Sequence, residues 1–398
     1  MSRLDVLNVK FLMKKNILLV SNYPSNTRYA WWLMEHFWCL LADEVIAQGG
    51  KAFIAFPKLS SLSEKIKNSA AKKVELRVVK ADKELKKFIQ KNNIRIVYFT
   101  DRAYFNPLYF FLRKWGVKMI IVHDHIPGDR PPVNGIKRFL KTLRNKTPFT
   151  TADAVLNVSE LIRQRSIYNG CVPAHKTFTV QNGIEPISLC SVTREKKRRD
   201  LGAGHETTLV VTTGRAHPYK RFGFVIQVAR FFKKRFPDVD VQFLLIGDGP
   251  QFSELEKMVD EHGLRSFVHL LGYRADIREL LQAGDIGFHA SLGEAFSLSI
   301  VEYMSANMPV FVPDIPSVSQ AVDHMKNGLI YPWDDPETAA LMLGKIVHDR
   351  DLVRQMGIAA RVKSTDIYNL DECSRQFLKI YRSLIRINDG FLQRTETP

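Results

Sequence analysis

Cysteine is scarce in this chain of 398 residues and shows none of the spacings that would give it a structural role. The four cysteines, Cys39, Cys171, Cys190 and Cys373, are far apart and form no C-x-x-C pair. The sequence therefore predicts reduced thiols, as in a cytoplasmic protein, and argues against a disulfide framework or a zinc site. It shows no secretory leader and no apolar run of membrane-spanning length, so we expect a soluble or peripheral protein.

Acidic residues are in short supply only in the first half of the chain. Residues 1–180 carry 31 Lys+Arg against 13 Asp+Glu, whereas residues 181–398 carry 27 against 28. The net charge of +17 therefore belongs to the first half. This asymmetry favours a polyanionic partner for that half: an acidic membrane surface, a phosphorylated glycolipid or nucleic acid. No zinc finger or other clear recognition motif for nucleic acid is present, which weakens the third possibility.

Short apolar runs bounded by turn residues predict strands along most of the chain. With 45% hydrophobic residues, the chain can bury two cores. The expected strands alternate with helical patterns, as in α/β domains with parallel sheets. Residues 191–201 are densely charged, and we expect them to form an exposed connection. The predicted strands are 14–21, 51–57, 74–80, 95–100, 118–122, 153–158, 208–213, 241–247, 268–271, 285–290 and 310–312.

The stretch from Ser291 to Pro313 predicts a loop, a helix and a strand in succession. Glu294 lies in the loop beyond the carboxyl end of a strand, where open parallel sheets bind their ligands, and Glu302 follows near the helix start. The helix N-terminus between them offers unpaired N–H groups that suit a phosphate. These groups together suit a diphosphate that carries two hydroxylated rings, such as a nucleotide-sugar.

Both carboxylates also have ordinary explanations. Ser299 and Glu302 fit a capping box, in which the serine holds the amide of Glu302 and the glutamate holds the amide of Ser299. Glu294 is equally compatible with a solvated loop position. The residues alone leave these alternatives open.

The spacing of Glu294 and Glu302, with seven residues between them, resembles the E-x7-E signature of the retaining glycosyltransferases of family 4. The match is strong from about residue 175 to 332 and weak before it. The surrounding residues that carry it are Gly293, Phe296, Ser297, Pro309 and Val310.

This resemblance implies an α/β protein with the GT-B fold, in which two Rossmann-like domains face each other and the second holds the nucleotide-sugar. A C-terminal helix would cross back to the first domain. The expected parts are a basic acceptor-side domain at 13–183, a donor-binding domain at 184–370, the crossover helix at 371–387, and flexible ends at 1–12 and 388–398.

The resemblance also implies a donor site in the second domain. Arg215 and Lys220 would hold the departing diphosphate, and two cations at a strand end and a helix start suit that task on chemical grounds, although an ordinary surface pair is the alternative. Glu294 would hold sugar hydroxyls and Glu302 the ribose. Tyr273 would stack on the nucleobase, unless it is a packed loop tyrosine. The backbone contacts to the donor would come from Gly214, Phe296, Ser297 and Leu298.

One residue of the first domain is implied as well. His123, at the carboxyl end of a strand, matches the histidine that contacts the transferred sugar in the family. His125 is the alternative ligand, and a structural hydrogen bond is the alternative role for His123. A metal held by the two histidines is not expected, because no third ligand is apparent.

The chain departs from the family pattern at three places. The loop 21–28 lacks the usual pair of glycines near Ser25, Arg221 stands where a glycine is common, and Gln320 stands where a glutamate is usual. These departures leave open a non-catalytic relative that only binds nucleotide-sugars.

We therefore expect a metal-independent, retaining hexosyltransferase without a cofactor. Its donor would be a UDP- or GDP-sugar, and its acceptor a glycolipid, lipopolysaccharide or other polysaccharide precursor of the cell envelope. Residues 135–146 form a basic amphipathic pattern, typical of a helix that lies on an anionic membrane surface. An ordinary surface helix has the same pattern. A nucleic-acid-binding protein is the more remote alternative.

Overall fold

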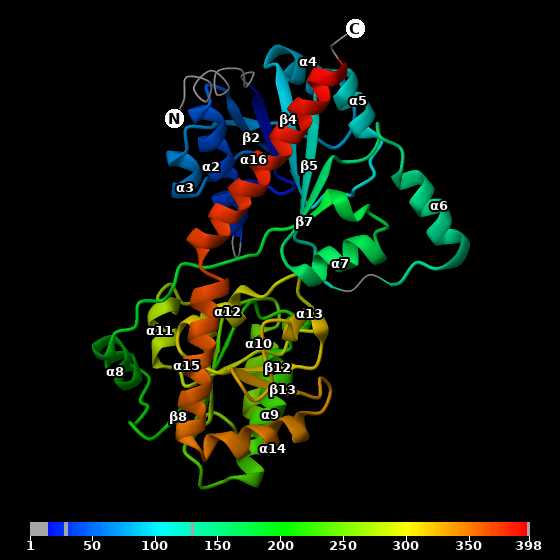
Figure 1. The fold of residues 1–398 in the computed structure, drawn as a ribbon. Helices are drawn as coiled ribbons and strands as arrows, with labels where there is room; N and C mark the ends of the chain where they lie inside the picture. Colours follow the sequence, from blue (N-terminus) through cyan, green and yellow to red (C-terminus); the bar gives the residue numbers. More distant parts are fainter. Residues whose placement is uncertain (1–14, 28–30, 129–130, 396–398) are drawn as a thin grey trace, which may run out of the picture. The chain divides into compact units, whose positions relative to one another are not determined.

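The computed structural model describes residues 15–27, 31–128 and 131–395, which form two units that each contain one sheet (Figure 1). The first unit extends to Gln181, apart from a few loop residues after Ile126, and takes up the chain again from Cys373. The second unit covers Asn182–Glu372. The chain thus changes unit two residues before the predicted boundary at 183/184. The flexible end predicted for residues 1–12 lies outside the described residues.

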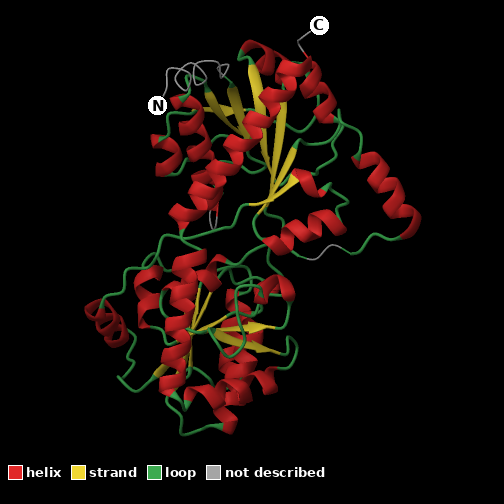
Figure 2. Cartoon of the chain, in the orientation of Figure 1, coloured by secondary structure: helices red, strands yellow, loops and turns green. Residues whose placement is uncertain are grey.

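The first unit has a parallel sheet of seven strands in the order β3-β2-β1-β4-β5-β6-β7, with helices around it (Figure 2). Leu18 of β1 pairs with Phe53 of β2 on one side and Val97 of β4 on the other. The strands are β1 Asn16–Val20, β2 Ala52–Phe56, β3 Lys72–Glu75, β4 Ile94–Thr100, β5 Met119–Asp124, β6 Ala154–Asn157 and β7 Thr177–Thr179. The helices are α2 Trp31–Ala47, α3 Glu64–Asn68, α4 Lys83–Lys91, α5 Leu108–Lys114, α6 Gly135–Asn145, α7 Glu160–Tyr168 and the 3-10 turn η1 Ala174–Lys176. The final helix, α16 Leu370–Thr395, begins in the second unit and belongs to the first from Cys373 on.

The second unit has a parallel sheet of six strands in the order β10-β9-β8-β11-β12-β13. The strands are β8 Thr208–Thr213, β9 Val241–Ile246, β10 Val268–Gly272, β11 Ile286–Phe288, β12 Val310–Pro313 and β13 Gly328–Tyr331. The helices are α8 Ser191–Asp200, the 3-10 turn η2 Pro218–Lys220, α9 Phe222–Arg235, α10 Phe252–Glu261, α11 Ile277–Ala283, α12 Leu298–Ser305, α13 Pro316–Ser319, α14 Pro336–Val347 and α15 Arg350–Ile367.

Both sheets have a point at which the strand order reverses. The chain winds outward from β1 in one direction and resumes beside β1 with β4, and β8 and β11 have the same relation in the second sheet. Open α/β sheets bind ligands in the crevice beyond the carboxyl ends of the two strands at such a point. In the second unit this crevice is bordered by the loops after β8 and β11.

Apolar strands explain why the sheets form where they do. Leu18, Val97 and Ile120 of the first unit and Val210 and Phe243 of the second are each at most 1% exposed. They belong to two separate clusters of buried side chains, one in each unit. The near-continuous burial of these strands is typical of parallel sheets covered by helices on both faces.

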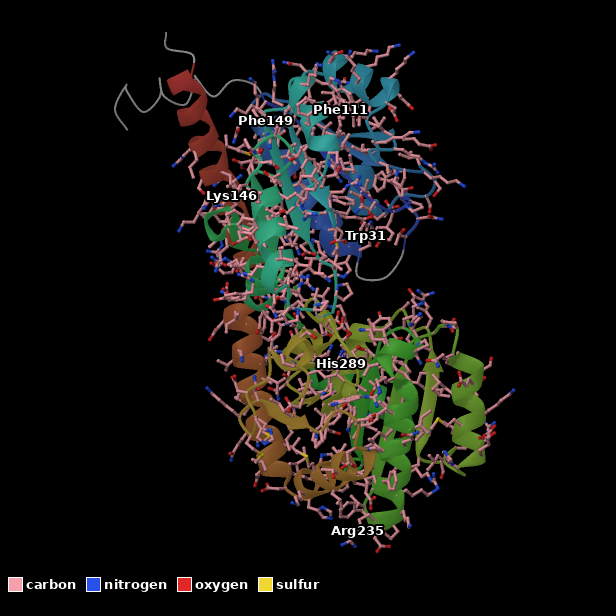
Figure 3. All side chains as sticks on the ribbon, turned by 90° about the vertical axis from the view of Figure 1, so that its right-hand side faces the viewer. Trp31, Phe111, Lys146, Phe149, Arg235 and His289 are labelled. Carbon is pink, nitrogen blue, oxygen red and sulfur yellow. The ribbon has the colours of Figure 1, made fainter. Side chains whose placement is uncertain are left out.

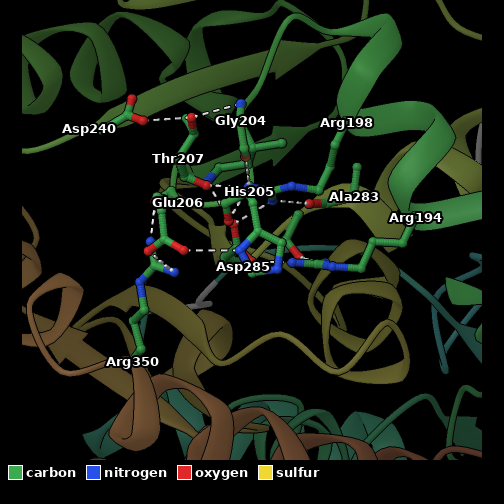
Figure 4. A network of polar contacts seen from close by, with 12 residues as sticks. Arg194, Arg198, Gly204, His205, Glu206, Thr207, Asp240, Ala283, Asp285 and Arg350 are labelled. Atoms are coloured by element: carbon green, nitrogen blue, oxygen red, sulfur yellow. Dashed lines mark hydrogen bonds and ion pairs between the residues drawn. The ribbon is translucent and has the colours of Figure 1, made fainter.

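Most of residues 191–200 are exposed, as their charge predicted, but two of the charged side chains, Lys197 and Arg198, are buried. Residues 191–200 form α8, and Arg198 is only 7% exposed. Arg198 donates to the carbonyl oxygens of Ala283 and Gly204 and pairs with Asp285 at 3.0 Å (Figure 4). Charged residues enter a domain when each charge finds a partner, and these partners come from elements distant in the sequence.

The final helix is longer than predicted. It was expected at 371–387, followed by a flexible end, but α16 continues to Thr395. Gly390 lowers helix stability by only about 1 kcal/mol, and no proline follows before Pro398, so nothing forces the helix to stop at 387.

All four cysteines are unpaired, as predicted. Among the residues that the structure describes, no helix combines the length and the apolar character needed to cross a membrane.

Candidate functional site

The loop that follows β8 is held by the backbone of a neighbouring glycine-rich loop. A Cβ atom on Gly247 would lie 1.7 Å from the carbonyl oxygen of Gly214, and one on Gly249 would lie 2.4 Å from that of Ala216. Ala216 N–H also donates to the carbonyl of Asp248 at 3.0 Å. The two glycines are therefore required because only a residue without a side chain allows this close approach.

Lys220 and Glu294 meet at the carboxyl ends of β8 and β11. The Lys220 Nζ atom lies 2.5 Å from Glu294 Oε1, and the two side chains are 12% and 13% exposed. Ser291 Oγ donates to the same carboxylate oxygen at 2.7 Å, and His289 Nε2 lies 3.3 Å from it. Three donors thus converge on Oε1, whereas no described residue donates to Oε2. The second oxygen is available to accept hydrogen bonds from a ligand.

These contacts keep Glu294 ionised. Burial alone would raise the pKa of its carboxyl, but the charge of Lys220 and the hydrogen bond from His289 lower it to about 2. Burial lowers the pKa of His289, so the imidazole is neutral at pH 7 and acts as a hydrogen-bond donor. The solvated loop carboxylate considered as an alternative for Glu294 is therefore wrong. Figure 3 labels His289 within the second unit.

Glu302 lies in α12, but it does not form a capping box. The helix begins at Leu298 with Ser297 as its N-cap, so Ser299 is already inside the first turn. A capping box requires the serine at the N-cap, and that alternative is excluded. The Glu302 carboxylate makes no hydrogen bond or ion pair with the described residues. Burial raises its pKa to about 7, although the charges of Arg278 and Lys220 act in the opposite direction.

The raised pKa predicts that Glu302 lowers stability as the pH rises. The Glu302 carboxyl has a pKa of 4.5 in the unfolded chain and about 7 in the folded protein. Below pH 4.5 it is protonated in both the folded and the unfolded state, whereas between pH 4.5 and about 7 only the folded state keeps the proton. Stability is therefore lost over this range, and Glu302→Gln should be more stable than wild type by roughly 3 kcal/mol near pH 8 but not near pH 4. Urea unfolding at several pH values measures this difference. The exposed Glu337→Gln serves as the control, and a wild-type advantage or a pH-independent difference at 302 would contradict the assignment.

The start of α12 provides free backbone N–H groups beside these carboxylates. Ser297 makes no side-chain hydrogen bond to the amides of the first turn, and its hydroxyl lies 3.4 Å from His289 Nε2 instead. Phe296 is buried and packs against Tyr368, with ring centroids 5.1 Å apart. The first amides of the helix, near Leu298, are therefore available to an anion.

The remaining predicted donor residues are near solvent. Tyr273 follows β10 and is 77% exposed, so it is not a packed loop tyrosine. Arg215 is exposed in the loop after β8. Arg221, which replaces a common glycine, has a left-handed φ of 54° and donates to the carbonyl of Trp333 at 2.6 Å. This contact compensates for a backbone conformation that favours glycine.

Two residues that shape the site, His289 and Ser291, were not predicted as site residues, and the contact made by Gln320 was not predicted either. His289 and Ser291 follow β11 directly, and their position just after a strand end was the available signal. Gln320 Nε2 donates to the carbonyl of Ala295 at 3.2 Å, and so steadies the loop that carries Glu294. A glutamate at 320 has no N–H to donate, so the glutamine performs a structural role of its own.

The predicted histidine of the first unit is enclosed. His123 is the last residue but one of β5 and is 1% exposed, and its Nδ1 lies 2.5 Å from the Tyr98 hydroxyl. Its Nε2 has no hydrogen-bond partner among the described residues. Burial holds its pKa well below 6.5. His125 lies beside it, with ring centroids 4.1 Å apart, and keeps partial exposure.

A cavity of about 530 Å³ lies elsewhere in the second unit. Its lining includes Thr208, which begins β8, and Asp285, just before β11. The cavity is therefore at the amino edge of the sheet, where parallel sheets do not usually bind ligands. Arg194 and Arg198 line it, but both are paired with Asp285. Among the described residues, no group of three or more His, Cys, Asp or Glu side chains is arranged to hold a metal ion.

Comparisons with known proteins match part of the second unit to a protein family. Residues 193–363, in the second unit, match the family model of the glycosyl transferases group 1. The N-acetyl-alpha-D-glucosaminyl L-malate synthase of Bacillus anthracis is 22% identical over 259 residues, 65% of this chain and 65% of that protein. The D-inositol 3-phosphate glycosyltransferase of Corynebacterium urealyticum is 28% identical over 198 residues, 48% of this chain and 46% of that protein. The chain thus spans about half to two thirds of the length of these relatives.

The fold agrees over nearly the whole chain. The structure of Anabaena Alr3699/HepE in complex with UDP has a TM-score of 0.72 with this chain, covering 93% of it and 100% of that chain at 18% identity. At this identity the likeness shows the fold, and it confirms the predicted GT-B class. The second unit thus matches the family model of the glycosyl transferases group 1, within a chain that has the GT-B fold.

Proposed function

We propose that this protein is a retaining, metal-independent glycosyltransferase that transfers a hexose-type sugar from a nucleoside-diphosphate sugar. The observation that carries the proposal is the meeting of Lys220, Glu294 and the start of α12 at the strand-order reversal of the second sheet. A cation and free helix amides suit a diphosphate, and a fixed carboxylate oxygen suits sugar hydroxyls.

Each group of the site has a separate task in this proposal. Lys220 and Arg215 neutralise charge on the diphosphate as it leaves, and the amides near Phe296, Ser297 and Leu298 assist them. Glu294 holds sugar hydroxyls through its unused Oε2. No protein nucleophile is needed, because the leaving diphosphate itself accepts the proton of the acceptor.

Three further residues complete the donor site. Glu302 accepts hydrogen bonds from the ribose hydroxyls, Tyr273 stacks on the base, and Gly214 allows the backbone to approach the phosphates. The complex of Alr3699/HepE with UDP supports a nucleoside-diphosphate donor for a protein of this fold.

The sugar-positioning role belongs to a histidine of the first unit. His123 occupies the family position, but its ring must become accessible before it touches a ligand. His125 is the alternative because it already reaches solvent. Either neutral imidazole can hold a sugar hydroxyl.

The acceptor is proposed from charge. The excess of cations in residues 1–180 suits a lipid-linked or otherwise anionic glycan precursor at the cytoplasmic face of a membrane. The relatives named above act on malate and inositol phosphate according to their names, and both of these acceptors are anionic.

Calorimetric titration with UDP, GDP and their sugar conjugates tests the proposal. We expect one nucleotide to bind, and Glu302→Ala to weaken it about ten-fold by removing the two ribose contacts. The control is Glu337→Ala, an exposed glutamate in the first turn of α14, which should bind as wild type does.

The possible outcomes separate the alternatives. Absence of binding by wild type at millimolar nucleotide would overturn the donor assignment. Tight binding of a nucleotide-sugar without release of nucleoside diphosphate, with any acceptor class, would favour a non-catalytic relative.

A further inference from the structure

Helix α6 of the first unit carries large apolar side chains on the surface. Ile136 is 75% exposed, Phe139 66%, Leu140 56% and Leu143 56%. Residues at this spacing share one face of a helix. A surface helix normally turns such a face toward the core, yet here it faces solvent. Figure 1 shows α6 at the outer edge of the first unit.

The opposite face attaches α6 to the protein. Arg138 donates to the carbonyl of Tyr168 at 2.7 Å, and Lys141 donates to that of Asn169 at 2.6 Å. These carbonyls lie at the C-terminal end of α7, where cations are favourable. The side chain of Asn145, 3% exposed, donates to the carbonyl of Gly170 at 2.9 Å.

The arrangement is the reverse of an ordinary surface helix. At roughly 100° per residue, residues 138, 141 and 145 lie opposite the apolar group. The polar face is therefore bound to the protein and the apolar face is outside. The ordinary surface helix, which the sequence left open for residues 135–146, is wrong.

Cations border the exposed apolar face. Lys137 and Arg144 lie on one side of it, and Lys146 lies on the other, labelled in Figure 3. Phe149, 62% exposed, follows the helix. No acidic residue occurs from 131 to 152. The surface thus combines an apolar stripe with positive charge and has no negative charge of its own.

We propose that this surface of α6 docks on an anionic lipid bilayer. The four apolar side chains enter the boundary between head groups and acyl chains, and the bordering cations meet the lipid phosphates. A second copy of the chain is a poorer occupant, because two such faces would bring their cations together. The inference goes beyond the proposed transfer reaction and does not rest on it.

Co-sedimentation with lipid vesicles tests the proposal. Wild type should partition onto phosphatidylcholine vesicles that contain about one third phosphatidylglycerol, and much less onto phosphatidylcholine alone. The double variant Phe139→Ser, Leu143→Ser should lower partitioning at least about ten-fold, because two large side chains no longer enter the lipid.

A matched control exists in the second unit. Ile358 and Val362 of α15 are 48% and 54% exposed and have the same spacing of four residues. The double variant Ile358→Ser, Val362→Ser should bind vesicles as wild type does. The charge variant Lys137→Glu, Lys146→Glu should lose binding to the anionic vesicles, and Lys86→Glu, Lys87→Glu on the solvated α4 should lose much less.

Three results would overturn the proposal. The first is equal wild-type binding to both kinds of vesicle, and the second is unchanged binding after the serine substitutions on α6. The third is a wild-type dimer in light scattering that these substitutions convert to a monomer, which would assign the face to a second copy. Nucleotide titration of the same α6 variant should match wild type, so a failure of docking is distinguishable from a failure of the donor site.

Discussion

Replacement of Lys220 by alanine should lower the rate of nucleoside-diphosphate release from the donor by about 10² to 10³. In the proposed function this ammonium neutralises the leaving diphosphate, and in the structure it lies 2.5 Å from Glu294 Oε1. Without it, burial of Glu294 is no longer opposed by an adjacent positive charge, so the pKa of that carboxyl rises from about 2. The residual rate of the variant should therefore increase with pH in the range where wild type is constant.

Two controls separate this effect from loss of folding. Lys257→Ala removes an exposed lysine of α10 and should leave the rate unchanged. The double variant Lys220→Met, Glu294→Gln removes both charges of the pair, which avoids a buried unpaired carboxylate, and should fold as wild type but remain inactive. A Lys220→Ala rate within about three-fold of wild type would refute the role of this lysine, since the loss of one such donor costs far more.

Replacement of Asp285 by alanine should destabilise the second unit by about 3–5 kcal/mol, because it leaves the charge of Arg198 buried without its partner. Asp285 Oδ2 accepts from Arg198 at 3.0 Å and from the Leu209 amide at 2.8 Å. Its other oxygen pairs with Arg194, as Figure 4 shows. The pairs therefore fasten α8 to the amino edge of the sheet.

Chemical unfolding of the intact protein measures this loss. The surface pair of Arg265 and Asp260 is the comparison, because these side chains are 78% and 42% exposed. Asp260→Ala should change stability by less than about 1 kcal/mol. A loss of less than about 1 kcal/mol for Asp285→Ala would contradict the prediction. It would mean that water solvates the charges of Arg194 and Arg198 once the carboxylate is removed.

The sequence predicted strand limits and the positions of charged residues near strand ends. The run from Thr208 to Thr213 was predicted with its observed limits, and Lys220 and Glu294 were predicted near neighbouring strand ends, where they form an ion pair. Parallel strands place their carboxyl ends at one edge, so residues far apart in the chain meet there. The second oxygen of Glu294 and its three convergent donors were not predictable, because side-chain direction depends on packing.

The N-cap of α12, the packed face of α6 and the burial of Arg198 could not be predicted from the local sequence pattern. Ser297 and Ser299 are both acceptable N-caps, and the structure selects Ser297. The periodicity of residues 135–146 predicted two faces but not which one would pack. The partners of Arg198 are separated from it by up to 87 residues, so its burial has no local signal.

The close approach of Gly247 and Gly249 to the loop after β8 means that amino-acid substitutions at these two positions are not tolerated. A methyl group at 247 would overlap the Gly214 carbonyl, whereas Tyr273 projects into solvent. A mutagenesis library aimed at a new nucleobase preference should therefore randomise position 273 and keep 214–216 and 247–249 constant. The residues that the proposed function assigns to the phosphates would then stay unchanged, while the residue that it assigns to the base varies.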